Sequence, residues 1–455
     1  MALIALNPAN GKVIQEYPET SPADVETALR RAHETHREWR RTPFPHRREL
    51  MKKAASILRE RAREFGELMT REMGKPIAGG VAEVEKCAWV CDYYADNAQE
   101  FLADRDVETD APRSFVTFQP IGVVLAVMPW NFPFWQVFRF AAPGLMAGNA
   151  GVLKHASNVP GCALAIEEVF RGAGFPDGLF KTLLIPGSRV DAVIDHPLVR
   201  AVTLTGSTPA GRAVAQKAGE RLKKTVLELG GSDPYLILED ADLDAAASTC
   251  ATARLINSGQ SCIAAKRFIV VDAVREAFEE KFTTAMAQAK MGDPMEEDTV
   301  VGPQARSDLR DELHDQVVRS VAAGAKCTLG GKIPDGPGAY YPPTVLTDVT
   351  PGMPAYTEEL FGPVASIIPV KGEAEAIRVA NDSVFGLGAA VFTTDEERGT
   401  RIAREELEAG ACFVNAFVRS DPRLPFGGVK ESGYGRELSP FGIQEFVNIK
   451  TVWVE

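Results

Sequence analysis

One cysteine lies in a short polar segment whose residues are better suited to chemistry than to core packing. Residues 257–262 read Asn-Ser-Gly-Gln-Ser-Cys, so Cys262 follows polar side chains and a glycine. A long helical pattern precedes this segment, and the strand pattern Lys-Arg-Phe-Ile-Val-Val follows it. A thiolate in such a turn can attack an electrophilic carbon. The segment therefore predicts an enzyme with a cysteine nucleophile.

A lysine and a serine lie close together where an apolar strand pattern ends. Lys154 ends the strand, and Ser157 follows three residues later without a carboxylate beside it. Open α/β sheets bind their ligands at the carboxyl ends of the strands. An acidic side chain suits a free ribose 2′-hydroxyl, whereas an ammonium and a hydroxyl suit a 2′-phosphate. The pair favours NADP as the cofactor, with NAD as the alternative.

A second junction offers backbone groups to an anion. Residues 203–208 read Thr-Leu-Thr-Gly-Ser-Thr and lead from a strand pattern into a helix pattern, so Gly206 and Ser207 lie at the start of the helix. Helix N-termini present N–H groups and a positive dipole end to phosphates. The usual Gly-x-Gly-x-x-Gly fingerprint is missing at this place. We expect a nucleotide held by a different loop.

The elements that must position these residues follow an alternating pattern. The first hundred residues are predicted to be helical, with amphipathic spacing over 23–41, 50–73 and 81–101. Beyond residue 121, strand patterns alternate with helix patterns at 136–146, 161–170, 190–194 and 209–219. The strands are expected at 122–127, 151–154, 182–185, 201–205, 225–228, 268–271, 389–393 and 411–415. This rhythm predicts an α/β fold with two doubly wound, Rossmann-like parallel sheets.

Composition excludes several classes of protein. A chain of 455 residues with 45% hydrophobic and 25% charged residues is expected to form two or three globular domains. The net charge of −12 disfavours nucleic-acid binding. The first residues lack a basic segment followed by an apolar run, so we expect no secretory signal. The sequence also has no apolar run of membrane-spanning length and no cysteine pattern of a zinc site or disulfide framework. We expect a cytoplasmic protein without a metal or a membrane partner.

Seven segments carry a resemblance to the aldehyde dehydrogenase superfamily, and they occur in that family's order across nearly the whole chain. Two of them are Gly259-Gln-Ser-Cys262 and Pro129-Trp-Asn131-Phe-Pro. The others are Leu153-Lys154, Thr205-Gly-Ser-Thr208, Leu227-Glu228-Leu-Gly-Gly231, Glu358-Glu359-Leu-Phe361-Gly-Pro363 and Pro425-Phe-Gly-Gly428 with Lys430-Glu-Ser-Gly433. The resemblance implies an aldehyde dehydrogenase fold.

The resemblance also implies roles for individual residues. Cys262 would add to an aldehyde as the nucleophile, Asn131 would donate to the resulting oxyanion, and Glu228 would be the general base that activates water. The cofactor site would comprise Trp130, Lys154, Ser157, Gly206, Ser207, Glu359 and Phe361. Glu359 would bind ribose hydroxyls with Lys154, and Phe361 would lie against the nicotinamide.

The substrate is expected to be an aldehyde that bears a carboxylate. Arg139 lies among aromatic residues, where a guanidinium needs an anionic partner. Its position resembles that in family members acting on succinate semialdehyde, but Ile256 stands where some relatives have a second arginine. Further substrate-binding candidates are Trp135, Ser261, Ser420 and Arg423. Glutarate semialdehyde, one methylene longer, is the alternative substrate.

Domain limits and assembly follow from the same resemblance. A cofactor-binding domain is expected over 1–101 and 121–228 with 426–444, and a catalytic domain over 229–425. Residues 102–120 and 445–455 would form a small β element for oligomerisation. The C-terminal run alternates like an exposed strand that needs a partner. The resemblance implies a homodimer or homotetramer.

Two other classes of protein remain open at this point. A cysteine hydrolase would pair its thiol with a histidine, and the six histidines show no spacing that points to Cys262. A non-catalytic nucleotide binder on a dehydrogenase scaffold would be expected to lack one of the three catalytic candidates, and all three are present.

Overall fold

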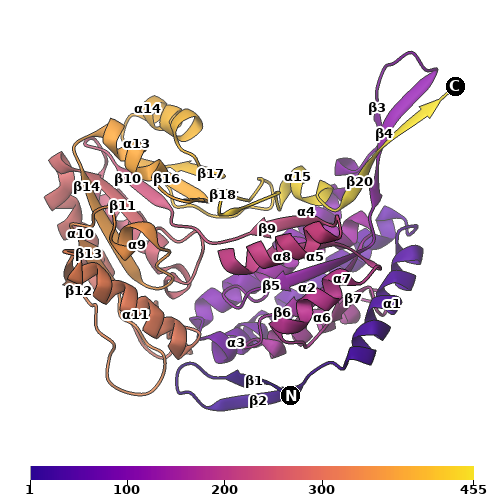
Figure 1. The fold of residues 1–455 in the computed structure, drawn as a ribbon, viewed down its shortest axis with the longest axis horizontal. Coiled ribbons are helices and arrows are strands. Elements are labelled where there is room, and N and C mark those ends of the chain that lie inside the picture. Colours follow the sequence, from indigo (N-terminus) through magenta and orange to yellow (C-terminus); the bar gives the residue numbers. More distant parts are fainter. Residues whose placement is uncertain (1) are drawn as a thin grey trace.

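Two α/β bodies and a projecting β arm make up the molecule (Figure 1). The structure is a computed structural model, and it describes residues 2–455. Each body is built around one main sheet, of six strands in one and seven in the other. These sheets and their helices confirm the predicted α/β fold class.

The first body contains the six-stranded sheet, in the order β19-β9-β8-β5-β6-β7. All neighbours are parallel except β19, which runs antiparallel to β9. The strands are β5 (Val123–Met128), β6 (Ala150–His155), β7 (Phe180–Thr182), β8 (Val199–Thr205), β9 (Lys224–Glu228) and β19 (Gly433–Tyr434). The helices are α1 (Pro22–Trp39), α2 (Phe44–Glu60), α3 (Ala62–Met73), α4 (Ile77–Phe101), α5 (Trp135–Ala147), α6 (Pro160–Gly172), α7 (Val190–Asp195), α8 (Thr208–Glu220) and α15 (Ser439–Gln444).

The second body contains the seven-stranded sheet, in the order β12-β13-β14-β11-β10-β16-β17. Only β12, at one edge, is antiparallel to its neighbour. The strands are β10 (Pro234–Ile237), β11 (Arg267–Val271), β12 (Lys326–Leu329), β13 (Thr344–Thr347), β14 (Val364–Val370), β16 (Gly388–Phe392) and β17 (Ala411–Val414). The helices are α9 (Leu243–Leu255), α10 (Arg275–Ala287), α11 (Ser307–Ala322), α12 (Pro354–Thr357), α13 (Glu373–Asn381) and α14 (Glu396–Arg401).

The projecting arm joins two segments far apart in the sequence. Strand β4 (Arg113–Pro120) pairs antiparallel with β20 (Val447–Val454) along its whole length and with the short β3 (Arg105–Asp106). The chain's C-terminus lies at the tip of this arm (Figure 1). The exposed C-terminal strand predicted from the sequence thus has a partner within the chain, and β20 leaves its other edge open.

The N-terminal residues differ from the prediction of an all-helical first hundred residues. Strands β1 (Ala2–Leu6) and β2 (Val13–Pro18) form an antiparallel hairpin. Its turn contains Pro8 and Gly11, and Gly11 has a φ of 73° that glycine adopts without strain. Leu3 and Ala5 alternate with exposed neighbours, which is the pattern of a strand with one buried face.

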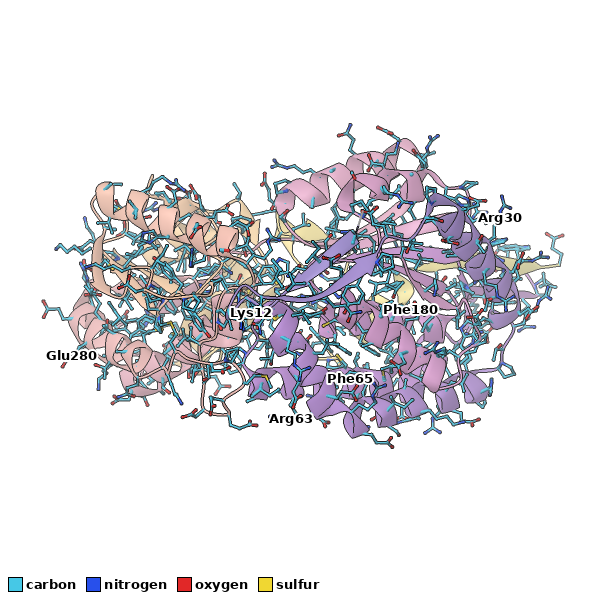
Figure 2. All side chains as sticks on the ribbon, turned by 90° about the horizontal axis from the view of Figure 1, so that it is seen from below. Lys12, Arg30, Arg63, Phe65, Phe180 and Glu280 are labelled. Atoms are coloured by element: carbon cyan, nitrogen blue, oxygen red, sulfur yellow. The ribbon has the colours of Figure 1, made fainter. Side chains whose placement is uncertain are left out.

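Apolar side chains form the buried core, and most charged side chains lie at the surface. Phe65 and Phe180 belong to the largest buried cluster, which extends through the first body. Figure 2 shows Arg30 and Glu280 at the outer surface of the two opposite bodies. Among the helices described for residues 2–455, none is long and apolar enough to cross a membrane.

Candidate active site

The candidate nucleophile follows a backbone turn of unusual conformation. After α9 ends, Asn257, Ser258 and Gly259 have φ values of 52°, 56° and 77°. Two non-glycine residues in this region are strained and persist only where the surroundings hold them. A Cβ at Gly259 would lie 2.2 Å from the carbonyl carbon of Gly362, so only glycine fits there. The turn presents Cys262 at a defined place between the two bodies.

Two buried cations hold this turn through its carbonyl groups. The Arg254 guanidinium donates to the Gly259 carbonyl at 2.7 Å. The Lys266 ammonium donates to the carbonyls of Cys262 at 2.9 Å and Ser261 at 3.0 Å. Charge-assisted hydrogen bonds of this kind are stronger than neutral ones. The backbone that carries Cys262 is therefore held by two residues outside the polar motif.

Two cavities meet at Cys262. One, of about 430 Å³, is lined by Cys262 and by Ser261, Phe132, Trp135, Arg139, Ile256, Phe417, Ser420 and Lys86, among others. The other, of about 510 Å³, is lined by Cys262 and by Trp130, Asn131, Thr205, Gly206, Ser207, Leu229, Glu359 and Phe361, among others. We call them the substrate cavity and the cofactor cavity. Cys262 is the one catalytic candidate that borders both.

The thiol of Cys262 is held in its neutral form. Burial raises its pKa to about 12, Glu359 and Glu228 act in the same direction, and Arg139 and Lys266 oppose them. A thiol is a far weaker nucleophile than a thiolate. Reaction therefore needs the thiol proton to leave as the carbon–sulfur bond forms.

Asn131 lies beside Cys262 in the cofactor cavity and is almost fully buried. Its amide nitrogen donates to the Gln260 carbonyl at 3.1 Å, two residues before the nucleophile. The Asn257 amide nitrogen in turn donates to the Asn131 carbonyl at 2.7 Å. These bonds attach the loop after β5 to the cysteine turn.

Glu228 ends β9 and is buried without lining either cavity. Within residues 2–455, neither of its carboxylate oxygens has a hydrogen-bond partner. Burial raises its pKa to about 8, and the charge of Arg139 partly opposes the rise. Gly427 makes room for it, since a Cβ there would lie 2.9 Å from its Oε1. The result is a carboxyl group able to exchange a proton near neutral pH.

Arg139 has a protein partner that the sequence did not reveal. It is 2% exposed and forms an ion pair with Glu437, which is also buried. Its guanidinium carbon lies 4.6 Å from the ring centroid of Phe426, and its Nη2 donates to Thr205 at 3.4 Å. Arg139 also borders the substrate cavity, so it meets both a protein carboxylate and the space for substrate.

Five of the cofactor candidates, Trp130, Lys154, Ser157, Gly206 and Ser207, lie at or just after the carboxyl ends of strands in the six-stranded sheet. Leu204 of β8, Val127 of β5 and Lys154 of β6 are adjacent in register, so their strands end side by side. Gly206 and Ser207 follow β8, and Ser207 caps α8 by accepting from the Ala210 N–H. Ligands bind where parallel strands end, and phosphates bind at helix N-termini. The carboxyl ends of β5 and β8 border the cofactor cavity.

Lys154 and Ser157 lie at and after the carboxyl end of β6, the strand next to β5, and they do not line the cofactor cavity. Lys154 is 9% exposed, and burial lowers its pKa. It forms no ion pair with any carboxylate of residues 2–455. Ser157 is exposed. A buried ammonium without a counter-charge fits an anionic group of a nucleotide.

Glu359 and Phe361 close the opposite side of the cofactor cavity. The Glu359 carboxylate accepts from the Gly231 N–H at 3.0 Å and pairs with Lys266 at 3.4 Å. The Phe361 ring meets the Trp130 ring edge to face, with 5.7 Å between centroids. Both residues therefore border the same cavity, on segments held by contacts with the rest of the protein.

The predicted substrate residues divide into two groups. Trp135, Ser261 and Ser420 are buried and border the substrate cavity with Arg139. Arg423 does not border it; its exposed guanidinium pairs with Asp421 at 2.7 Å. Sequence reasoning missed three residues, Lys86, Lys266 and Glu437. Lys86 and Glu437 meet the site through packing of distant segments, whereas Lys266 lies four residues after Cys262 and bonds to the turn locally. Lys86 alone left a signal, as a cation on the face of α4 that carries Gly79 and Ala82.

No histidine lines either cavity in the described chain. A cysteine hydrolase would need such a base beside its thiol.

A family model and several known proteins match nearly the whole chain, and they agree with one another. The model of the family described as "Aldehyde dehydrogenase family" matches residues 2–452. A Synechocystis sp. protein named "Probable succinate-semialdehyde dehydrogenase (NADP(+))" is 54% identical over 454 residues, which cover 100% of both chains. The Mycobacterium tuberculosis protein named "Succinate-semialdehyde dehydrogenase (NADP(+)) 1" is 49% identical over 457 residues, again covering 100% of both.

Solved structures agree with the fold across the whole chain. A succinic semialdehyde dehydrogenase from Streptococcus pyogenes, in complex with NADP⁺, is 40% identical, with a TM-score of 0.97 and 100% of both chains covered. A lactaldehyde dehydrogenase reaches the same TM-score, 0.97, at 31% identity, covering 100% of this chain and 96% of the other. Overall shape is therefore shared by enzymes for different aldehydes, and the substrate must be argued from the cavity.

Proposed function

The chain belongs to the aldehyde dehydrogenase family, and from this premise we propose that it oxidises succinate semialdehyde to succinate with NADP⁺. The observation that carries the proposal is the position of Cys262, which borders both a substrate cavity with cationic side chains and a separate cofactor cavity. An aldehyde can reach the sulfur from one side while a nucleotide reaches the same place from the other.

The first chemical step forms a bond between the Cys262 sulfur and the aldehyde carbon. The carbonyl π bond breaks as the sulfur bonds to carbon, the carbonyl oxygen passes through an oxyanion, and that oxygen takes up the proton that leaves the thiol, so a neutral thiohemiacetal results. The Asn131 amide and the Cys262 backbone N–H would stabilise that oxyanion, each as a fixed donor. Because Asn131 already bonds to the Gln260 carbonyl, its amide is held next to the cysteine turn before substrate arrives.

The second half of the reaction releases the product. NADP⁺, when bound, supplies the two-electron acceptor that turns the thiohemiacetal into a thioester. Glu228 then takes a proton from water, the water oxygen bonds to the acyl carbon, and the carbon–sulfur bond breaks to give the acid. A base with a pKa of about 8 is ionised in about one molecule in ten at pH 7 and in about half of them at pH 8, and its ionised form accepts a proton readily.

NADP⁺ fits the residues at the sheet edge. Gly206, Ser207 and the N-terminus of α8 would hold phosphates, and Glu359 would bind ribose hydroxyls. Lys154 and Ser157 would bind the 2′-phosphate, because a buried ammonium without a protein counter-charge favours an anion. An acidic residue at this place would instead favour NAD.

Replacing Lys154 by methionine is expected to reduce kcat/KM for NADP⁺ roughly ten- to hundredfold, the usual loss for one charged hydrogen bond. With NAD⁺ the loss should be clearly smaller, because residue 154 would meet a neutral ribose hydroxyl and not a phosphate. Steady-state kinetics with each nucleotide measures the ratio. Lys181→Met on β7, where the ammonium pairs with Glu167, is the matched control and should leave the ratio unchanged. Equal losses with both nucleotides would contradict the 2′-phosphate role.

The substrate cavity supports an aldehyde with a carboxylate. Arg139, Ser261 and Ser420 border it with their polar groups, while Phe132, Trp135 and Phe417 supply apolar walls. Succinate semialdehyde and butanal have the same chain length and differ in the carboxylate. We expect kcat/KM with NADP⁺ to be at least about a hundredfold higher for succinate semialdehyde, as buried cationic donors would provide. A preference for butanal would overturn the proposed substrate.

Assembly and domain division stay proposals as well. We infer a homodimer or homotetramer that forms through the arm of β3, β4 and β20, since Ile449, Trp453 and Val454 expose large apolar side chains there. The cofactor-binding domain would span 1–101, 121–228 and 426–444, and the catalytic domain 229–425. A cytoplasmic location would keep the Cys262 thiol reduced.

A further inference from the structure

One face of α4 forms a wall of the substrate cavity and carries a single cation. Ala78, Gly79, Ala82, Glu83 and Lys86 all line the cavity, at the spacing of one helical face. Ala78, Gly79 and Ala82 are small, so they leave space in the cavity beside the helix. Lys86 is the one long side chain on this face whose charge is not paired with a carboxylate in residues 2–455.

Two neighbours fix the Lys86 ammonium. It donates to the Ser420 hydroxyl at 2.8 Å and lies 4.3 Å from the ring centroid of Trp135. Both neighbours are buried and line the same cavity. Because the Ser420 oxygen accepts from Lys86, its own hydroxyl hydrogen remains free to donate. The ammonium and the hydroxyl therefore form a pair of donors on the cavity wall.

Other cations at this cavity are either neutralised or exposed. Lys75 forms a buried ion pair with Glu83. Arg139 is paired with Glu437, so much of its charge is already balanced. Arg419 borders the cavity without a carboxylate partner in the described residues, but its side chain is exposed and lies over Phe417 at 5.8 Å. Water screens such an exposed charge.

We propose that Lys86, with the Ser420 hydroxyl, binds the carboxylate of the substrate and is the main determinant of specificity for an acidic aldehyde. The inference rests on the proposed function and names the group that selects the substrate. Ile256, on another wall of the cavity, offers no charge at the place where a second arginine was considered from the sequence. Lys86 supplies the missing cation from a different element, one that precedes the nucleophile by more than a hundred residues.

The pKa of the Lys86 ammonium allows the proposal to be tested on the parent enzyme, without any substitution. Burial lowers its pKa to about 8, and Arg139 of α5 acts in the same direction. Glu83 and Cys87 on α4 and Asp421 on the segment after β17 oppose this shift. The cation is lost as pH rises through 8, so binding of a carboxylate should weaken there. The ratio of kcat/KM for succinate semialdehyde to that for butanal removes effects common to both aldehydes, including ionisation of Glu228.

The experiment measures this ratio with NADP⁺ between pH 6.5 and 9.5 for the parent, Lys86→Met, Lys86→Arg and Arg419→Met enzymes. We expect the parent ratio to fall above pH 8. Lys86→Met should lower the ratio roughly ten- to hundredfold through KM for succinate semialdehyde, the size expected for one charge-assisted contact. Lys86→Arg should restore most of the ratio and remove its pH dependence. Arg419→Met should change it less than threefold.

Several outcomes would overturn the inference. One is a ratio that stays at the parent value in Lys86→Met, or equal losses on both aldehydes. Another is a larger drop in Arg419→Met, which would assign the carboxylate to Arg419. If Lys86→Met does not fold, a parent ratio that is flat across pH 8 still rejects the role of Lys86. A parent enzyme without preference for succinate semialdehyde rejects the proposed function itself, before any variant is compared.

Discussion

Cys262→Ala is expected to abolish aldehyde-dependent NADPH formation, with a loss of at least about 10⁴-fold in kcat. No other cysteine borders either cavity in the described chain, so no second thiol can replace it. Binding of the nucleotide should persist, because its contacts are backbone groups and side chains of other elements. Absorbance at the reduced nicotinamide band measures the first effect, and fluorescence titration with NADPH measures the second.

The control for this prediction is a cysteine with a similar environment and no access to the site. Cys412 on β17 is half-buried, and burial raises the pKa of its thiol to about 11. Cys412→Ala should retain most of the parent activity. Mass spectrometry of acid-quenched turnover should find the acyl group on the peptide that contains Cys262. Acyl attachment at another residue, or parental turnover by Cys262→Ala, would remove the basis of the mechanism.

The sequence predicted most of the sheet-forming elements, and the reason is physical. Strands buried on both faces appear as short apolar runs, such as Val123–Met128, and the helices between them have amphipathic spacing. The N-terminal hairpin was missed because its strands are short and half-exposed. The strand expected at 182–185 lies instead at Phe180–Thr182. Short elements carry too little periodicity for their limits to be placed.

Local motifs located the residues of the site, but not their partners. Lys154, Gly206 and Cys262 lie where turns and strand ends predict reactive groups. The ion pair of Arg139 with Glu437 joins residues about three hundred positions apart, and nothing in the sequence near either one indicates it. Arg423 shows the opposite error, since the sequence placed it near substrate and the structure pairs it with Asp421 on the surface. Pairings of this kind depend on how whole segments pack.

Packing also explains a motif that the sequence left without a role. In the segment Pro425-Phe-Gly-Gly428, the Phe426 ring lies against the Arg139 guanidinium at 4.6 Å. Gly427, with a φ of 158°, leaves the space that the Glu228 carboxylate occupies. Phe426 and Gly427 therefore each lie against a charged group of the site. The arrangement connects the last part of the chain to the chemistry of Cys262.

Glu228→Gln is expected to slow steady-state turnover by roughly 10²- to 10⁴-fold, the usual contribution of a general base. The amide cannot take a proton from water, so hydrolysis of the thioester becomes rate-limiting. Formation of the thioester does not need this base, so the variant should produce a burst of about one NADPH per active site. Rapid mixing with succinate semialdehyde and NADP⁺ measures the burst and the slow phase separately.

The pH dependence of the parent enzyme also tests the role of Glu228, because its raised pKa fixes the direction of the effect. Burial raises the pKa of Glu228 to about 8, and only the ionised carboxylate can accept a proton. Hydrolysis should therefore accelerate as pH rises through about 8 and then level off, and this rise should vanish in Glu228→Gln. Glu431→Gln makes the same chemical change at a half-exposed carboxylate that pairs with Arg212 and borders neither cavity, and it should keep the parental profile. A Glu228→Gln enzyme with parental turnover, or with an unchanged pH profile, would show that water is activated by another group, and the buried unpaired carboxylate would then need a different explanation.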